Sequence, residues 1–392
     1  MRARVFLKKD IRKELANGHS WIYANEIEMQ DQADDGELVD VFSHSNQFLG
    51  IGYINSSSLI RVRIISRLRH QIDETFFRSK IERAIRLRRR ALPGRRSVRV
   101  VFGESDGLPG LIVDKFSDYL VVQISTLGMT MMKEQIIGAL VKVLQPKGIY
   151  EKTDGSFLEK EGMEETHEWL FRSGPIIIPF EVHGLTFLAD LKGQKTGFFL
   201  DQVENAQQVA VYFRDSAVLD VFGYTGNFSV HALAAGAKSC EVVDISERAL
   251  GVARETMRIN GFEGRVSFSN RNAFDYLREI EPGSFDAAVV DPPSLVKSRN
   301  TVENALRGYK ELNLRAVRVL KNGGVLATSS CSQLISRDSW ESTLSEAFED
   351  NRTVGVQLLS SSQPPDHPAA VPVKESHYLK FKVFSVTPLT AF

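Results

Sequence analysis

The segment that most constrains the fold of this chain is residues 217–228, which read Ala-Val-Leu-Asp-Val-Phe-Gly-Tyr-Thr-Gly-Asn-Phe. An apolar run of strand length comes first, and Gly223 and Gly226 then let the backbone turn tightly and approach a ligand. Asn227 is a residue type that caps helices, so we expect a helix over 228–235. A strand, a glycine turn and a helix N-terminus in this order predict a corner where backbone amides face a bound molecule.

The next strand along the chain ends in an acidic residue. Residues 240–243 are apolar and of strand length, and Asp244 follows them. A carboxylate there can accept hydrogen bonds from both ribose hydroxyls of a nucleoside. The Gly-x-x-Gly spacing is not the dinucleotide pattern Gly-x-Gly-x-x-Gly, however, and glycine turns also occur in doubly wound folds that bind no nucleotide. At this point a purely structural turn stays open.

Strands and helices alternate through the C-terminal half of the chain. The expected strands, with helical patterns between them, are 218–222, 240–243, 266–269, 285–290, 324–329 and a closing strand at 379–386. This alternation predicts an α/β domain with a mostly parallel, Rossmann-like sheet covered by helices on both faces. Ligands of such sheets bind beyond the carboxyl ends of the strands, so the residues that follow the strands are the candidates for chemistry.

The composition describes a globular chain with more than one domain. Its 392 residues exceed the usual size of one domain, and 49 basic residues balance 49 acidic ones. The start is charged where a secreted protein carries an apolar segment, and no apolar run has membrane-spanning length. The two cysteines, Cys240 and Cys331, exclude a disulfide framework. We therefore expect a cytoplasmic protein with reduced thiols and no membrane contact.

Three domains are expected. Residues 1–70 read as a small, mostly β module, because short alternating runs are separated by turn formers. Residues 71–183 read as a central α/β domain, in which 98–102 and 119–124 are strands. Residues 184–392 contain the sheet described above.

A local excess of positive charge lies across the first domain boundary. The basic residues there are Arg61, Arg63, Arg67, Arg69, Arg78, Lys80, Arg83, Arg86, Arg88, Arg89, Arg90, Arg95, Arg96 and Arg99. Part of the stretch predicts an amphipathic helix with the apolar side Phe76, Phe77, Ile81, Ala84, Ile85 and Leu87. In a chain of zero net charge this excess favours contact with RNA phosphates over a merely solvated face.

Two further motifs follow strands of the C-terminal sheet. Asp291-Pro292-Pro293-Ser294 ends an apolar strand, so the aspartate is presented at the sheet edge and the prolines stiffen the next segment. Cys331 lies in a run of hydroxyl residues after the fifth strand. Its thiolate could attack C6 of a pyrimidine. The alternative is a buried structural cysteine, which is the role we expect of Cys240 inside its strand.

The order of these motifs resembles that of class I S-adenosylmethionine-dependent methyltransferases. The resemblance implies that the glycine turn holds the methionine part of the cofactor, Asp244 the ribose, and Asn272 with Ala273 the adenine. The candidate cofactor-binding residues are Gln202, Phe222, Gly223, Tyr224, Thr225, Gly226, Asn227, Phe228, Asp244, Ile245, Ser246, Asn272, Ala273, Asp291 and Pro292. Gln202 is included because the helix that it introduces precedes the first strand and can cover the methionine end, although it could equally be a packing or capping residue. No metal site is expected, and a nicotinamide or ATP site is disfavoured because neither of their glycine motifs is present.

Segments outside the sheet narrow the resemblance to one family. The stretch from Gly18 to Tyr23 resembles a PUA domain, an RNA-docking β barrel, with Ser20 where that pattern has proline. Residues 193–202, 307–310, 366–368 and 378–380 are similar to the bacterial 23S ribosomal RNA cytosine-C5 methyltransferases of the RlmI type, which carry an N-terminal PUA domain. The resemblance covers nearly the whole chain.

This family resemblance implies a covalent reaction on ribosomal RNA. Cys331 would be the nucleophile, and Asp291 would hydrogen-bond the target base or the cofactor. Glu375 and His367 are candidates for removing the C5 proton, and a homodimer is compatible with the resemblance. Two other functions stay open: methylation of guanine nitrogen without a covalent intermediate, and a non-catalytic RNA-binding role in ribosome assembly.

Overall fold

The computed structural model describes residues 2–296 and 298–392, and the chain forms two compact units. The first unit comprises Met1–Phe180, Ala189–Gly197 and Pro365–Ser376. The second comprises Glu181–Leu188, Phe198–Pro364 and His377–Phe392. The three-domain division at 70 and 183 stays a prediction, and the structure adds that two short later segments belong to the first unit.

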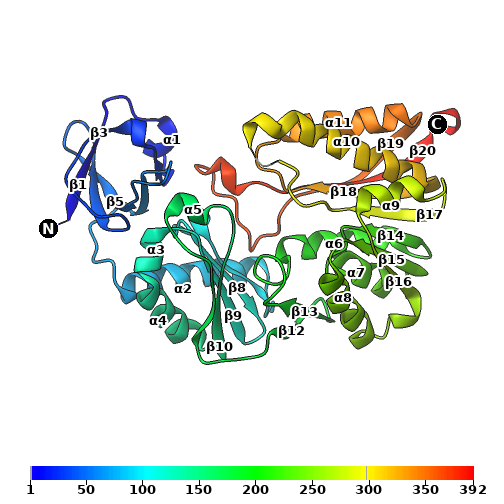
Figure 1. Ribbon diagram of the computed structural model, residues 1–392, viewed down its shortest axis with the longest axis horizontal. Coiled ribbons are helices and arrows are strands. Elements are labelled where there is room, and N and C mark those ends of the chain that lie inside the picture. The colour runs from blue at the N-terminus through cyan, green and yellow to red at the C-terminus, as the bar shows by residue number, and fades with distance from the viewer. Residues whose placement is uncertain (1, 297) are drawn as a thin grey trace. The chain divides into compact units, whose positions relative to one another are not determined.

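A six-stranded sheet forms the N-terminal part of the first unit (Figure 1). Its order is β2-β6-β5-β4-β1-β3, with β1 (Ala3–Leu7), β2 (Trp21–Ile22), β3 (Ile27–Gln30), β4 (Leu38–Phe42), β5 (Phe48–Ile54) and β6 (Val62–Ser66), and a short helix α1 (Lys13–Ala16) follows β1. Alternate residues of β4 face inward, and Val39 and Val41 join Val5 and Leu7 in a buried core. The expected small β module is therefore present.

A five-stranded sheet forms the rest of the first unit's core. Its order is β11-β10-β9-β8-β7, with β7 (Val98–Phe102), β8 (Leu111–Phe116), β9 (Tyr119–Ile124), β10 (Gly148–Thr153) and β11 (Thr166–Phe171). The helices of this part are α2 (Glu74–Ala91), α3 (Leu127–Met131), α4 (Lys133–Leu144) and α5 (Leu158–Glu161). Apolar residues of α2, α4 and the strands share one buried cluster, which fixes both helices on the sheet.

The buried face of α2 differs from the predicted one at its C-terminal end. Asp73 caps the helix by accepting a hydrogen bond from the Phe76 amide at 2.9 Å, and Phe77 and Ile81 are buried as expected. Leu87 is 43% exposed, so its assignment to the apolar side was wrong. Arg88 is buried in its place, because its guanidinium donates two hydrogen bonds to Asp106 at 2.6 and 2.7 Å.

Part of the basic stretch between residues 61 and 99 is structural. Arg63 is buried and lies 2.8 Å from Glu161, and Arg99 donates to both carboxylate oxygens of Asp114 at 2.7 and 2.8 Å. These acids lie outside the stretch, so counting charges along the sequence overstated the number of exposed cations. The remaining arginines on the outer side of α2 stay exposed.

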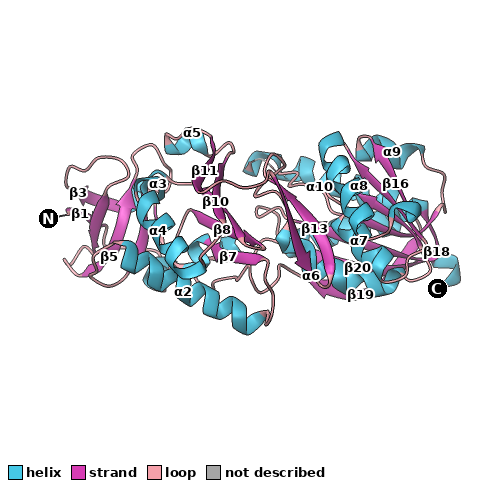
Figure 2. Ribbon diagram, turned by 90° about the horizontal axis from the view of Figure 1, so that it is seen from below, coloured by secondary structure: helices cyan, strands magenta, loops and turns pink. Residues whose placement is uncertain are grey.

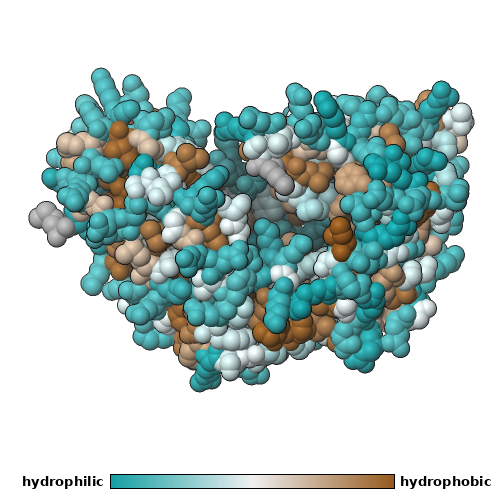
Figure 3. Space-filling model, in the orientation of Figure 1, coloured by the Kyte–Doolittle hydropathy of each residue, from teal (hydrophilic) through white to brown (hydrophobic). Residues whose placement is uncertain are grey.

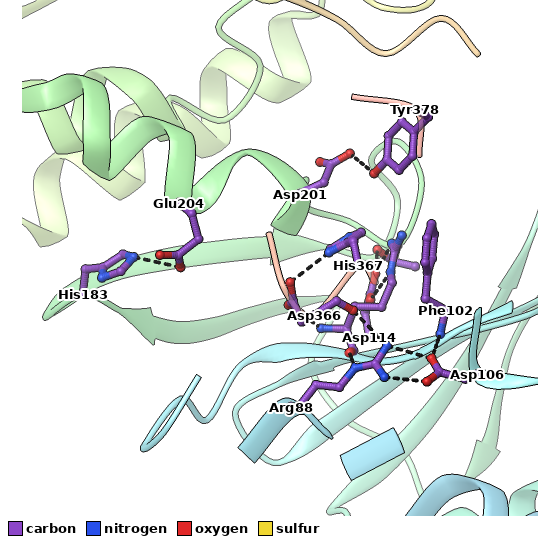
Figure 4. A network of polar contacts seen from close by, with 12 residues as sticks. Arg88, Phe102, Asp106, Asp114, His183, Asp201, Glu204, Asp366, His367 and Tyr378 are labelled. Carbon is purple, nitrogen blue, oxygen red and sulfur yellow. Dashed lines mark hydrogen bonds and ion pairs between the residues drawn. The ribbon is translucent and has the colours of Figure 1, made fainter. Parts of the chain in front are cut away.

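The segment Pro365–Ser376 is anchored to the first unit through Asp366. One Asp366 carboxylate oxygen accepts from the Arg99 amide at 2.9 Å, and its backbone carbonyl accepts from Arg88 at 2.9 Å (Figure 4). His367 Nδ1 lies 2.9 Å from the other carboxylate oxygen. Burial opposes ionisation of Asp366, but the charge of His367 and these hydrogen bonds hold its pKa below the usual value.

The second unit is built on a seven-stranded sheet in the order β16-β15-β14-β17-β18-β20-β19 (Figure 2). The strands are β14 (Ala217–Val221), β15 (Ser239–Asp244), β16 (Val266–Asn270), β17 (Phe285–Val290), β18 (Leu320–Ser330), β19 (Thr353–Ser361) and β20 (Lys380–Pro388). The pairs among β14 to β18 are parallel, and β20 is antiparallel to both of its neighbours. The predicted Rossmann-like sheet is confirmed.

Helices cover both faces of this sheet (Figure 1). On one face lie α9 (Ala273–Glu279), α10 (Val302–Val319) and α11 (Arg337–Asp350), and on the other α6 (Val203–Ala210), α7 (Asn227–Ala234) and α8 (Glu247–Ile259). A separate hairpin is formed by β12 (Ile177–Val182) and β13 (Leu185–Asp190). The chain passes from the first unit to the second within β12 and back again within β13.

Hydrophilic side chains cover most of the face shown in Figure 3, as expected of residues outside the cores. Among the described residues, the structure has no helix that combines the length and the apolar character needed to cross a lipid bilayer.

Candidate active site

Four of the predicted motifs meet at one edge of the second unit's sheet. The strands β15, β14, β17 and β18 are neighbours and run parallel, so their carboxyl ends lie side by side. These ends carry Asp244, the glycine turn, Asp291 and Cys331 respectively. Parallel pairing thus brings together residues that are far apart in sequence.

The turn after β14 is held in an unusual backbone conformation. Phe222, Tyr224 and Gly226 have φ values of 63°, 46° and 82°, in the left-handed region that non-glycine residues rarely adopt. At Gly223 the constraint is space, because a Cβ there would lie 2.5 Å from Val242 Cγ1. Strain of this kind is retained where the surrounding structure over-determines it, as at ligand sites.

The predicted capping role of Asn227 is wrong. The N-cap of α7 is Gly226, and Asn227 is the first residue of the helix. Its side chain is buried, and neither its amide nitrogen nor its oxygen has a hydrogen-bond partner within the described residues. Buried polar atoms without partners are rare in proteins and call for a ligand or water.

Asp220 is a site residue that the sequence patterns did not single out. It is the fully buried fourth residue of β14, and one carboxylate oxygen accepts from the Ser229 amide at 3.2 Å and hydroxyl at 2.7 Å. Its other oxygen has no partner in the described part of the chain. Burial raises the pKa of Asp220 to about 6, the Ser229 hydrogen bonds oppose this, and the charge of Asp244 adds to it.

Asp244 organises the loop after β15. Its two carboxylate oxygens accept from the amides of Tyr224 at 3.0 Å and Ser246 at 2.8 Å, so it joins this loop to the glycine turn. Ser246 caps α8 by accepting from the Ala249 amide at 3.2 Å. Ile245 between them is 73% exposed, which leaves an apolar surface beside the carboxylate.

The predicted adenine-binding residues begin α9. Asn272 caps the helix, and its side-chain oxygen accepts from the Phe274 amide at 2.9 Å. Ala273 is buried in the core, so only its backbone can face a ligand.

Asp291 lies in a polar cluster at the end of β17. One of its oxygens accepts from Gln202 Nε2 at 2.7 Å and also from the Ser329 hydroxyl. Gln202 is itself held by Asn205, which donates to its oxygen at 2.7 Å. Desolvation raises the pKa of Asp291 to about 7, the Ser329 and Gln202 hydrogen bonds lower it, and the nearby charge of Asp201 raises it. This carboxyl therefore keeps a protonated fraction closer to neutral pH than an ordinary aspartate does.

Cys331 and Cys240 occupy opposite environments. Cys331 is partly exposed directly after β18, and its sulfur lies 4.0 Å from the Pro292 carbonyl oxygen of the Asp-Pro-Pro motif. Cys240 is buried in β15, where desolvation raises its pKa to about 12. The structural environment predicted for Cys240 is confirmed, whereas Cys331 has the access that a nucleophile requires.

The residue after Cys331 fixes the position of the loop. The Ser332 hydroxyl lies 3.0 Å from the Ser294 hydroxyl and 2.9 Å from the Tyr309 hydroxyl of α10. These contacts link the cysteine loop to the segment after Asp-Pro-Pro.

Lys380 approaches the same loop from β20, a position that no sequence pattern predicted. Its ammonium donates to the carbonyls of Ser332 at 2.9 Å and Tyr378 at 3.0 Å, and the residue is 6% exposed. Desolvation lowers the pKa of Lys380 to about 8, the charge of Cys331 opposes this, and the charge of Arg337 adds to it. A cation thus lies beside the cysteine loop.

The other two candidates, Glu375 and His367, belong to the first unit. Glu375 lies 3.4 Å from His19 Nε2, and His367 is buried against Asp366. Both side chains contact first-unit residues.

Two family models match the chain. Residues 5–67 match a PUA-like domain, and residues 161–381 match the S-adenosylmethionine-dependent methyltransferases. A ribosomal RNA large subunit methyltransferase I from Alteromonas mediterranea is 35% identical over 99% of this chain and 100% of its own length. The chain belongs to this methyltransferase family. A relative of the same name from Pseudoalteromonas atlantica is 36% identical over 97% of this chain and 98% of its own.

Solved structures agree with the fold of these methyltransferases. A Streptococcus mutans protein named as a SAM-dependent methyltransferase superposes with a TM-score of 0.82 at 20% identity, over 97% of this chain and 99% of its own. A related methyltransferase structure, at 19% identity and also with a TM-score of 0.82, was solved with SAH. The predicted family, fold and methyl donor are confirmed, and S-adenosylmethionine is the cofactor.

The sheet edge fits this cofactor chemically. Within the described residues, the Asn227 amide atoms and one Asp220 oxygen have no partner, and such atoms would suit the amino and carboxylate groups of a methionine moiety. The Asp244 carboxylate would suit ribose hydroxyls, and exposed Ile245 would suit the face of a ring.

Proposed function

We propose that this chain methylates C5 of a cytosine in large-subunit (23S) ribosomal RNA, with Cys331 as the covalent nucleophile. The observation that carries the proposal is the placement of Cys331. A partly exposed thiol lies at the carboxyl end of β18, beside Pro292 and near the Lys380 ammonium. A guanine N-methyltransferase needs no such thiol.

The proposed cofactor residues are those predicted from the sequence, at the ends of β14, β15 and β17 and the start of α9. When bound, S-adenosylmethionine supplies an electrophilic methyl group. The turn from Phe222 to Phe228 would hold its methionine part, Asp244 its ribose, and Asn272 its adenine. Gln202 would act indirectly, because it positions Asp291 through the 2.7 Å hydrogen bond.

The first chemical step is addition of the Cys331 sulfur to C6 of the cytosine. The C5–C6 π electrons become available at C5, and negative charge develops toward N3 as the S–C6 bond forms. Protonated Asp291 can donate a hydrogen bond to N3 and stabilise this charge, since its pKa of about 7 keeps the acid form populated at neutral pH. Gln202 and Ser329 donate to one Asp291 oxygen and fix the orientation of the carboxyl group.

The following steps restore the aromatic base. C5 would take the methyl group that S-adenosylmethionine supplies, and the electrons of the broken sulfur–methyl bond would stay on the cofactor's sulfur as a neutral thioether. The C5 proton then passes to a water molecule. The electrons of the broken C5–H bond re-form the C5–C6 double bond as the sulfur leaves C6. Cys331 departs as a thiolate, which the Lys380 cation favours, and 5-methylcytosine is released.

The N-terminal regions would bind the RNA. We propose that residues 1–70 act as the PUA-like module, residues 71–183 as a central RNA-facing domain, and 184–392 as the catalytic domain. An RNA substrate of this kind places the protein in the cytoplasm. Phosphate contacts from exposed arginines position RNA without reading its sequence.

The test is methyl transfer to large-subunit RNA that lacks the modification. Wild-type protein with S-adenosylmethionine should yield 5-methylcytidine on nucleoside mass spectrometry, and Cys331→Ala should yield none. RNA with 5-fluorocytidine at the target should form a covalent complex with wild type only, because fluorine blocks elimination. A methylated guanosine product, or full activity of Cys331→Ala, would overturn the proposal.

A further inference from the structure

The first unit contains a pocket that the proposed chemistry does not use. It has a volume of about 180 Å³ and lies where the C-terminal end of α2 meets β7, β8 and the end of α4; these elements are visible in Figure 2. The residues that line it are Ile85, Arg88, Arg89, Arg95, Arg96, Val98, Val100, Lys115 and Leu144.

We propose that this pocket binds one nucleotide of the RNA, with the base on its apolar floor and a phosphate at its cationic rim. The ligand class rests on the proposed RNA substrate, but the pocket lies outside the sheet edge that carries Cys331. Typical small-molecule sites measure about 300–1,000 Å³. A smaller pocket suits one base of a longer chain better than a complete free ligand.

The floor of the pocket is apolar and held in place. It consists of Ile85, Val98, Val100 and Leu144, of which the first three are at most 9% exposed. Arg88 does not add a free charge, because Asp106 takes two of its hydrogen bonds and the Arg99 carbonyl takes another at 2.9 Å. Arg88 therefore supports the wall, and the aliphatic floor remains as an apolar surface that the face of a base can cover.

Cations from three elements line the rim of the pocket. Arg89, Arg96 and Lys115 lie there beside Arg95, and the single Asp118 carboxylate is shared between Arg96 at 3.4 Å and Lys147 at 3.0 Å. Desolvation lowers the pKa of Lys115, and Asp118 opposes this. Lys115 donates to the Arg96 and Ser117 carbonyls, so it also fixes the loop that carries Arg96.

The helix dipole explains the cations at the C-terminal end of α2 but not the other cations of the rim. Arginines in the last turn of a helix interact favourably with its dipole, which accounts for Arg88, Arg89 and Arg90. Arg96 and Lys115 come from the following loop and from β8, where the helix dipole gives no reason for a cation. Three separate elements thus converge on one apolar floor.

A nucleotide matches this combination better than an acidic peptide does. Guanidinium groups bind phosphates through paired hydrogen bonds and stack on aromatic rings. Apolar contact and guanidinium stacking against the face of a base tolerate any sequence, because every base has such a face, and this suits a contact away from the methylated base. An acidic peptide would satisfy the rim but leave the apolar floor uncovered.

The experiment compares two charge reversals on the same helix. Arg89→Glu alters the rim, and Arg86→Glu is the matched control, because both residues are exposed on α2 and Arg86 does not line the pocket. The full-length chain is titrated into a fluorescein-labelled single-stranded RNA of twelve nucleotides. Arg89→Glu should raise the dissociation constant at least tenfold, and Arg86→Glu less than threefold. Equal weakening by both would indicate a diffuse basic surface and overturn the pocket.

A second variant tests the floor without changing charge. Leu144 is half-buried at the pocket, and the larger side chain of Leu144→Trp should fill it. The dissociation constant for RNA should then rise by about the same factor as for Arg89→Glu. Thermal unfolding and calorimetric S-adenosylmethionine binding verify that each variant is folded. Unchanged RNA binding by folded Leu144→Trp, or equal competition by a glutamate hexapeptide, would overturn the assignment. If wild type binds RNA but makes no 5-methylcytidine, the proposed function is refuted instead. The difference in RNA affinity between the pocket variants and Arg86→Glu would still test the pocket.

Discussion

Replacing Lys380 by methionine should slow alkylation of Cys331 by iodoacetamide. At pH 7 the pKa of about 8 leaves Lys380 mostly protonated, so wild type presents a cation beside the sulfur. An opposite charge within about 4–6 Å favours an ionised group by about 1–3 pKa units. Since Cys331 is partly exposed, we take the lower end of this range, a pKa shift of about 1 unit, which corresponds to about 1.4 kcal/mol. The thiolate fraction and the alkylation rate should then fall about tenfold.

The assay is clean because the chain has two cysteines and Cys240 is 2% exposed. Alkylation rates are measured by mass spectrometry from pH 6 to pH 10, with Cys331→Ala as the blank. Lys382→Met is the matched control, because Lys382 lies on the same strand and pairs with Glu341 at 2.9 Å. Lys380→Arg should keep most of the wild-type rate.

The shape of the pH profile decides whether the effect is electrostatic. The rates of Lys380→Met and wild type should converge near pH 10, where Lys380 is neutral and the thiol is ionised in both. Wild-type reactivity of Lys380→Met at pH 7 would refute the argument. A loss of equal size at every pH would refute it too, because it would indicate a displaced loop.

Three further predictions concern other parts of the structure. Asp244→Ala should weaken S-adenosylmethionine binding by about 1.5–3 kcal/mol in calorimetry, because a charged acceptor is lost; undiminished affinity would contradict the assignment. The pKa of Asp291 is raised from 3.8 to about 7, so ionisation opposes folding, and this penalty grows as the pH rises from about 4 to about 7. In urea unfolding, the unfolding free energy of Asp291→Asn should therefore rise by about 2–4 kcal/mol relative to that of wild type as the pH increases over that range. Unfolding free energies of the two proteins that change in parallel with pH would contradict this. Arg88→Ala leaves buried Asp106 unpaired and should cost about 3–5 kcal/mol of unfolding free energy, whereas a loss below about 1 kcal/mol would show that the pair contributes little.

Much of the second unit could be predicted because its strands are short apolar runs that end in distinctive residues. The expected strand at 285–290 matches β17 at both ends, and the strand expected at 266–269 differs from β16 by one residue. Parallel pairing then determines that Asp244, Asp291 and Cys331 share an edge.

The errors have local physical causes. Asn227 was assigned as a cap from residue type alone, but the turn is one residue shorter, so Gly226 adopts the capping position and Asn227 begins the helix. Leu87 and Arg88 are neighbours on a helix, and a buried acid partner reversed which of them faces the core. Asp106 is distant in sequence from the helical pattern, so no periodicity could reveal it. Lys380 was missed for the same reason, because its contacts to the cysteine loop arise from antiparallel pairing of β20 with β18.

Because of the segment Pro365–Ser376, complete folding of the first unit depends on residues near the end of the chain. It completes the surroundings of Arg88 and Arg99, yet it emerges from the ribosome after almost all of the other sequence. A fragment that stops at residue 183 would lack Asp366 and leave two arginine contacts unmade in its interior. During synthesis the first unit therefore cannot complete its folding while only its N-terminal residues have emerged. It reaches its final stability only after these twelve late residues have been made.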